Sequence, residues 1–370
     1  MLGWRVLVRH VHVPALAILL LALPAAASFG NIAALFPSDG PEDCEWHLRA
    51  IRVDRAWALL ERVGRGLGEG VVVGVPDTGY VVHPEVPIAV GATGGVALEG
   101  SWDFVHRLGP ARDDLQPHDG LVSTSAHAVG LMSLLLSPRG KASGTEGRCG
   151  ASGVAPASRI VPAVVSHGVI AGARPLAQAI HQATERGVHI IAIAQGMPQA
   201  DADLHAAVRD AVQRGVIVIA AAGNGTPFVV YPAAFPEVIA VAATDVEDAP
   251  FPFTSNGPEL DIAAPGARVY AAFLRRDVLS SALHTEVRTL FGTTPATAQV
   301  AGVAALWLAY HGRAELLERY GAARLASLFR HLLQRSARRP ARYRATMMGA
   351  GIVDAEALLL APLPHVDEVP

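Results

Sequence analysis

The chain has 370 residues, of which 51% are hydrophobic and 17% are charged. This length and composition suffice for one large α/β domain or two small ones. The net charge of −3 and a pI near 6.6 give no indication of nucleic-acid binding.

Residues 1–27 have the features of a secretory signal. Arg5 and Arg9 provide a positively charged start, residues 15–23 an apolar core, and three alanines at 25–27 a small-residue cleavage site. The alternative is a single N-terminal membrane anchor. Because the apolar run is shorter than the ~20 residues that span a bilayer, cleavage is favoured. No later segment is a convincing membrane span.

Residues 28–45 contain several turn formers and read as a short linker. We expect one domain over residues 46–361 and a tail over 362–370. Cys44 and Cys149 are the only cysteines, and they form either one disulfide or two free buried thiols. Two cysteines without a neighbouring histidine pair argue against a structural zinc site.

Apolar, β-branched runs alternate with helical patterns along most of the chain. The predicted strands are 71–76, 159–165, 188–194, 216–220 and 238–243, with a short one at 102–104. Helices are predicted around 46–62, 176–186 and 203–213. Strand and helix repeats of this length predict an α/β fold with a doubly wound parallel sheet between two layers of helices.

An arginine-rich segment over 313–344 carries leucines at helical spacing. It predicts an amphipathic helix with a solvated basic face, and binding to an anionic surface is the alternative.

Four polar residues stand at ends of predicted elements. Asp77 follows the strand at 71–76, at the edge where open α/β sheets place ligands, although a loop aspartate that begins a turn is as common. His127 opens an apolar helix, although a surface or core histidine is the default for any single one of the 15 histidines, and Asn224 follows the strand at 216–220. Thr294 stands at the start of an Ala-rich helix, where free N–H groups and the helix dipole can stabilise an oxyanion. A plain helix N-cap is the alternative for Thr294.

Taken together, these segments resemble the subtilisin-like peptidases (subtilases, peptidase family S8). The resemblance covers about residues 46–360, and its acid, histidine and nucleophile positions come in the order found in subtilisin. Its motifs are Val75–Gly79, Ser125–Gly130, Ala221–Asn224 and Gly292–Thr294.

The resemblance implies a catalytic role for each residue. Asp77 would hold His127 in one tautomer, and His127 would take the proton of the nucleophile and later pass it to the leaving amine. The nucleophile position is Thr294. The Asn224 side chain and the Thr294 N–H would donate to the oxyanion.

The resemblance also implies a substrate cleft lined by residues 164–167 and by Ala194, Gln195 and Gly196, where a peptide pairs as an added strand. Family members often bind calcium through loop oxygens. Candidate carboxylates exist, but they form no recognisable ligand set, so neither a metal nor another cofactor is predicted. These candidates are Asp103, Asp113 and Asp114.

The sequence departs from the family at the nucleophile. Thr294 replaces the serine, and Pro295, Ala298 and Gln299 replace a methionine, a proline and a histidine. The threonine methyl restricts χ1 and crowds a pocket shaped for serine. Residues 28–45 are also too few for the folding pro-region that many secreted members carry.

Two functions follow from these observations. The first is an exported, periplasmic or secreted endopeptidase that hydrolyses peptide bonds in peptide or protein substrates. The second is a catalytically weak or inactive subtilase-fold protein that binds extended peptides or a protein partner. Neither implies nucleic acid or a membrane beyond the signal, and the oligomeric state is not predicted.

Overall fold

A computed structural model describes residues 41–369 except 91–93, 116–125, 139–148 and 277–281. The predicted signal and most of the predicted linker, as well as Ser125, lie outside the described residues. Asp39–Pro370 belong to one compact unit. Among the described residues, no helix combines the length and the apolar character needed to cross a bilayer.

The centre of this unit is an eight-stranded sheet in the order β2-β4-β1-β5-β6-β7-β8, with β3 also paired to β4. All its pairings are parallel, and its strands are almost entirely buried, as their β-branched and alanine-rich sequences predict. The strands are β1 (Val72–Asp77), β2 (Gly95–Val96), β3 (Trp102–Asp103), β4 (Arg159–Val164), β5 (Ile190–Ile193), β6 (Ile217–Ala221), β7 (Ile239–Thr244) and β8 (Ile262–Pro265).

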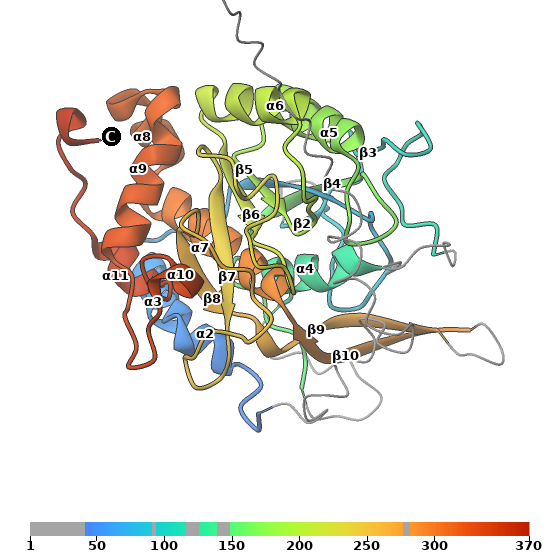
Figure 1. Cartoon of the computed structure of the whole chain (residues 1–370), viewed down its shortest axis with the longest axis horizontal. Helices are drawn as coiled ribbons and strands as arrows, with labels where there is room; N and C mark the ends of the chain where they lie inside the picture. Colours follow the sequence, from blue (N-terminus) through green and yellow to red (C-terminus); the bar gives the residue numbers. More distant parts are fainter. Residues whose placement is uncertain (1–40, 91–93, 116–125, 139–148, 277–281, 370) are drawn as a thin grey trace, which may run out of the picture. The chain divides into compact units, whose positions relative to one another are not determined.

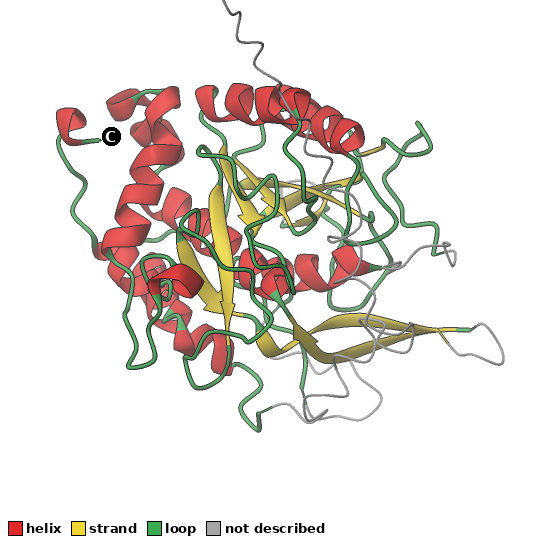
Figure 2. Ribbon diagram, viewed as in Figure 1, coloured by secondary structure: helices red, strands yellow, loops and turns green. Residues whose placement is uncertain are grey.

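Helices cover both faces of the sheet (Figures 1 and 2). On one face α7 (Thr293–His311) contacts β5 to β8 and packs against α4 (His127–Leu136). On the other, α5 (Ala173–Glu185) lies over β1 and β4, and α6 (Ala202–Gln213) over β6. The predicted three-layer, doubly wound α/β fold is therefore confirmed.

Helix α7 is enclosed on all sides, and every residue from Thr293 to Ala309 is buried. Its small residues permit close approach. For example, a Cβ at Gly302 would lie only 2.5 Å from the Cβ of Val154. The neighbours of α7 include α3 (Val53–Arg62) and α11 (Ala355–Leu360).

The ends of the compact unit pack on this framework. Helix α2 (Trp46–Ala50) precedes α3, and the predicted helix at 46–62 is thus two helices. Cys44 and Cys149 form a disulfide, with 5.5 Å between their Cα atoms, which decides between the two alternatives for the cysteines. The predicted tail holds a short 3₁₀ helix, η3 (Val366–Glu368), and the Pro364 carbonyl accepts a hydrogen bond of 2.7 Å from the Tyr320 hydroxyl.

The arginine-rich segment begins with two helices, α8 (Arg313–Tyr320) and α9 (Ala322–Arg335), separated by Gly321 at φ 77°. A short α10 (Ala345–Met348) follows. Arg319, Arg324 and Arg335 on these helices are exposed, in keeping with the predicted solvated basic face. Arg330 is an exception, because it donates to the carbonyls of Pro236 and Val238 and pairs with Asp261 at 3.2 Å. This arginine therefore joins α9 to the segment that leads into β7.

A two-stranded antiparallel hairpin, β9 (Ala267–Arg276) and β10 (Leu283–Phe291), has no counterpart among the predicted elements. It extends away from the sheet (Figure 2). Every residue of β10 is exposed or half-buried, and the strand carries Glu286 and Arg288, so it lacks the apolar pattern of a core strand. Its last residue leads directly into Gly292 and α7.

Candidate active site

The predicted site residues come together at one edge of the sheet. Asp77 is the last residue of β1, and Asn224 follows β6 after two further residues. His127 is the first residue of α4, and Thr294 the second of α7. Since the carboxyl ends of parallel strands meet at one edge, these segments converge there although they are far apart in the chain.

Asp77 and His127 form a close pair. The side chain of Asp77 is fully buried, and the Nδ1 atom of His127 lies 2.9 Å from its Oδ1 and 3.0 Å from its Oδ2. The Thr78 N–H also donates to Oδ1, at 2.7 Å. Because a carboxylate accepts but does not donate, this contact assigns the imidazole proton to Nδ1 and leaves Nε2 as an acceptor.

The electrostatic surroundings of His127 favour its protonated form. Burial alone would lower the pKa of His127, but the charge of Asp77 and its hydrogen bond, together with the charge of Asp113, raise that pKa above the ordinary 6.5. An imidazole placed in this way accepts a proton more readily than a free histidine does.

The hydroxyl of Thr294 lies on the other side of the imidazole, with Oγ1 3.2 Å from Nε2 of His127. Thr294 is buried and belongs to the first turn of α7, while the N-cap position is held by Gly292. The N-cap alternative for Thr294 is therefore wrong. Aspartate, imidazole and hydroxyl form a continuous hydrogen-bonded line.

Asn224 lies beside the same helix start. Its Oδ1 accepts a hydrogen bond of 3.0 Å from the Thr293 N–H, which orients the amide. In the described part of the chain, its Nδ2 has no acceptor. Gly292, at φ 115° and ψ −170°, permits this approach, because a Cβ there would lie 2.9 Å from Nδ2. The amide and the free N–H groups of the first turn of α7 thus face one small region.

The predicted substrate-binding residues follow β5; they are Ala194, Gln195 and Gly196. Main-chain groups of this segment are already hydrogen-bonded within the protein. The Gly196 N–H donates to the Val169 carbonyl at 3.2 Å, and the Gly196 carbonyl accepts from the Ala171 N–H at 3.4 Å. Gly196 is therefore already paired with the segment after β4.

Gln195 is buried and points toward Asp77. Its Nε2 donates to the Gly168 carbonyl at 2.5 Å and lies 3.4 Å from Oδ1 of Asp77. Both partners are acceptors, which fixes the orientation of the amide. The side chain thus links the cleft segment to the Asp77–His127 pair, a role the sequence reasoning did not assign.

Two further residues support the site and were not predicted to do so. The Asp113 Oδ2 accepts from the Ala126 N–H at 2.6 Å, and the Thr78 Oγ1 accepts from the Ala128 N–H at 3.2 Å, so they hold the residues on both sides of His127. Burial raises the pKa of Asp113, although hydrogen bonds from two backbone N–H groups and Thr78 act in the opposite direction. No sequence motif identifies such loop contacts.

Two of the three carboxylates considered for calcium already accept hydrogen bonds from the protein. Asp103 accepts from the N–H groups of Val105 and His106, each at 2.8 Å. Asp113 accepts from Leu115 at 2.9 Å and from Ala126. These oxygens serve to shape loops.

Comparison with known proteins finds a family match over most of the chain. Residues 68–351 match the subtilase family. Thermitase from Thermoactinomyces vulgaris is 32% identical over 266 residues, which are 71% of this chain and 81% of thermitase. M-protease from Shouchella clausii is 34% identical over 245 residues, which are 65% of this chain but only 55% of M-protease.

The fold also resembles that of a solved protease from Pseudoalteromonas arctica, with a TM-score of 0.68 and 22% identity over 88% of this chain and 99% of that one. At this identity the likeness bears on the fold alone. The family match over most of the chain, with the resemblance to thermitase, establishes the relationship. The chain belongs to the subtilase family.

Proposed function

We propose that the protein is an exported endopeptidase in which Thr294 is the nucleophile, His127 the general base and acid, and Asp77 the residue that orients the imidazole. The observation that carries this proposal is the line from Asp77 through His127 to the Thr294 hydroxyl, with contacts of 2.9 and 3.2 Å. Membership of a peptidase family supports the reaction class.

In the proposed reaction, Nε2 of His127 takes the Thr294 proton as Oγ1 attacks the carbonyl carbon of the scissile peptide bond. The negative charge that develops on the carbonyl oxygen accepts hydrogen bonds from Nδ2 of Asn224 and the Thr294 N–H. His127 then protonates the leaving amine, and water hydrolyses the acyl-enzyme by the reverse sequence.

Two observations support export. Residues 1–27 have the composition of a secretory signal. The disulfide between Cys44 and Cys149 belongs to the class of bond that persists in oxidising compartments and is rare in the cytosol.

The second candidate, a peptide-binding protein with little or no activity, is favoured by two features. The methyl group of Thr294 restricts rotation about χ1 beside His127, and a misplacement of about 1 Å can cost ~10²-fold in rate. In addition, the main chain of Gly196, which would pair with a bound peptide, is occupied by Val169 and Ala171.

Cleavage of casein and of a peptide library, read by mass spectrometry, tests the proposal. We compare the native protein with Thr294→Ala and Thr294→Ser, and use Thr285→Ala on the exposed part of β10 as the matched control. The native protein and the control should cleave, Thr294→Ala should lose cleavage, and Thr294→Ser should be at least as active as the native protein. A fluorophosphonate probe should label Thr294 in the native protein.

Other outcomes point elsewhere. Cleavage by Thr294→Ser together with a silent native protein would favour the second candidate. Peptide binding by Thr294→Ala, measured by fluorescence anisotropy, would then be direct evidence that the protein binds peptides without cleaving them. Absence of both cleavage and labelling in native and Thr294→Ser proteins would overturn a peptidase function.

The proposed mechanism predicts a pH dependence. His127 must be neutral to accept a proton, and its pKa is raised above 6.5. Activity should therefore be high on the alkaline side and fall with decreasing pH, with a midpoint above 6.5 in kcat/KM. A midpoint clearly below 6.5 would contradict the assigned role of the Asp77 carboxylate.

A further inference from the structure

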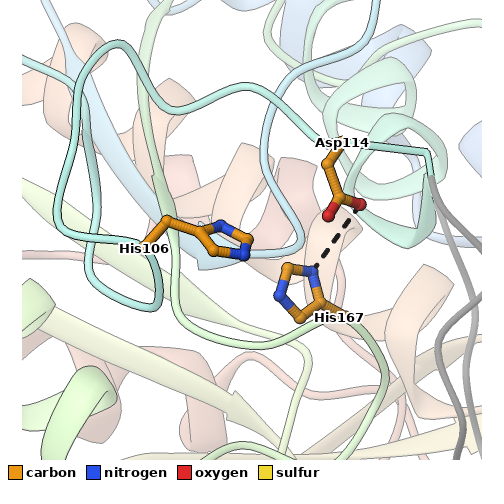
Figure 3. Close-up of side chains that lie close together, drawn as sticks. All are labelled: His106, Asp114 and His167. Atoms are coloured by element: carbon orange, nitrogen blue, oxygen red, sulfur yellow. Dashed lines mark ion pairs between the residues drawn. The ribbon is translucent and has the colours of Figure 1, made fainter.

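We propose that His106, Asp114 and His167 form a binding site for a transition-metal ion, with zinc as the expected occupant. Figure 3 shows these side chains converging from three loops. They are the only group of this kind within the described residues, and their potential ligand atoms all lie within 4.8 Å of one another. The site is separate from the Asp77–His127–Thr294 line, and the proposal does not depend on peptidase activity.

The arrangement is close to that of a metal centre. The Nδ1 atom of His167 lies 3.9 Å from Oδ1 of Asp114, and the two imidazole rings have centroids 5.0 Å apart and planes at 45°. Ligand atoms around a tetrahedral zinc ion are ~3.3 Å apart for bonds of about 2.0 Å. The His106 side chain is 44% exposed and Asp114 30%, so an ion can reach both residues from solvent.

The environment of His106 has a feature that metal-binding histidines share. Its Nδ1 lies 2.8 Å from Oδ2 of Asp103, which is buried. Donation of the Nδ1 proton to this carboxylate leaves Nε2 as a lone-pair donor, and Figure 3 shows a ring nitrogen of His106 on the side that faces His167. Asp103 thus orients the imidazole and increases its basicity.

Each ligand comes from a segment that is hydrogen-bonded to a strand of the sheet or to the loop that follows one. Asp103 ends β3 and holds the loop that carries His106 through two N–H contacts of 2.8 Å. Asp113, beside Asp114, donates its N–H to the Tyr80 carbonyl at 3.1 Å. His167 follows β4 closely, where the Val165 N–H donates to the Asp77 carbonyl at 2.9 Å. A bound ion would therefore join three loops next to the cleft.

The chemistry of the donors selects the metal. Two imidazoles and one carboxylate suit zinc and its neighbours among the transition metals, whereas calcium and magnesium prefer oxygen ligands. The sequence argues against a structural zinc site built on its two cysteines. That argument does not concern His106, Asp114 and His167, because this ligand set contains no cysteine. A water molecule would complete a four-coordinate ion.

Calorimetric titration of the purified, chelator-treated protein with zinc chloride at pH 7.5 tests the site. We expect one zinc ion per chain, and cobalt(II) should give the intense visible absorption of tetrahedral coordination. His106→Ala, Asp114→Asn and His167→Ala should each lose binding, while Asp103→Asn should bind about 10–100-fold more weakly. His284→Ala, in the exposed strand β10, is the matched control and should bind as the native protein does.

Calcium should neither compete with zinc nor raise the melting temperature through this site. The proposal is overturned if the native protein binds less than one zinc ion per chain, or if the three ligand variants bind as well as His284→Ala. Circular dichroism of each variant checks its fold, and the exposed position of His106 makes His106→Ala the variant least able to disturb it.

Discussion

Replacing Asp77 by asparagine is expected to lower kcat/KM by about 10⁴-fold. One carboxylate oxygen of Asp77 accepts the Thr78 N–H at 2.7 Å, and the asparagine carbonyl would keep this contact. The new NH₂ group would then donate to Nδ1 of His127, so the imidazole proton would move to Nε2. An imidazole in that tautomer cannot take the proton of Thr294.

Rates on a fluorogenic peptide measure this effect, in both the native and the Thr294→Ser backgrounds. Asp201→Asn is the matched control, because asparagine caps a helix as well as aspartate does and Asp201 caps α6, away from the site. An NMR titration should also show a lower pKa for His127 in Asp77→Asn, since the charge that raises it is gone. A loss below tenfold would exclude Asp77 from the proposed mechanism.

Removal of the disulfide between Cys44 and Cys149 should lower the free energy of unfolding more than any other change proposed for this protein. Cys44 and Cys149 are 105 residues apart, and a crosslink over such a loop restricts the unfolded chain by up to about 5 kcal/mol. The Cys44→Ser/Cys149→Ser protein should therefore unfold with a free energy lower by about 2–5 kcal/mol. At a fixed scan rate, its melting temperature should fall by roughly 5–10 °C.

Reduction supplies the control for this prediction. A reducing agent should lower the melting temperature of the native protein toward that of the double variant and leave the variant unchanged, because the chain has no other cysteine. Equal melting temperatures for both proteins, with two titratable thiols in the native one, would contradict the crosslink.

The sequence predicted the sheet well because its signals are local. The strand at 71–76 is a β-branched run, and its burial on both faces follows from that composition. Asp77 and Asn224 were identifiable because each ends or follows such a strand, and parallel topology brings those strand ends to one edge. His127 was identifiable because it begins an apolar helix.

Other features depend on contacts that no local pattern encodes. The hairpin of β9 and β10 is largely polar on its exposed strand, so it has no periodic apolar signal. Cys44 and Cys149 are far apart in the sequence and become neighbours only in the folded chain, and the same is true of His106 and His167. The engagement of Gly196 by Val169 and Ala171 is likewise a property of two loops in three dimensions.

The complete enclosure of α7 has a consequence for how this protein can adapt. The helix that carries Thr294 is also the one around which the hydrophobic interior is assembled, so its backbone has almost no freedom to shift without disturbing the interior. If the protein acts as the proposed peptidase, we expect changes in selectivity to originate in the surrounding loops, while the position of the threonine stays constant. A rigid position for Thr294 and adaptable loops around it thus belong to different parts of one chain.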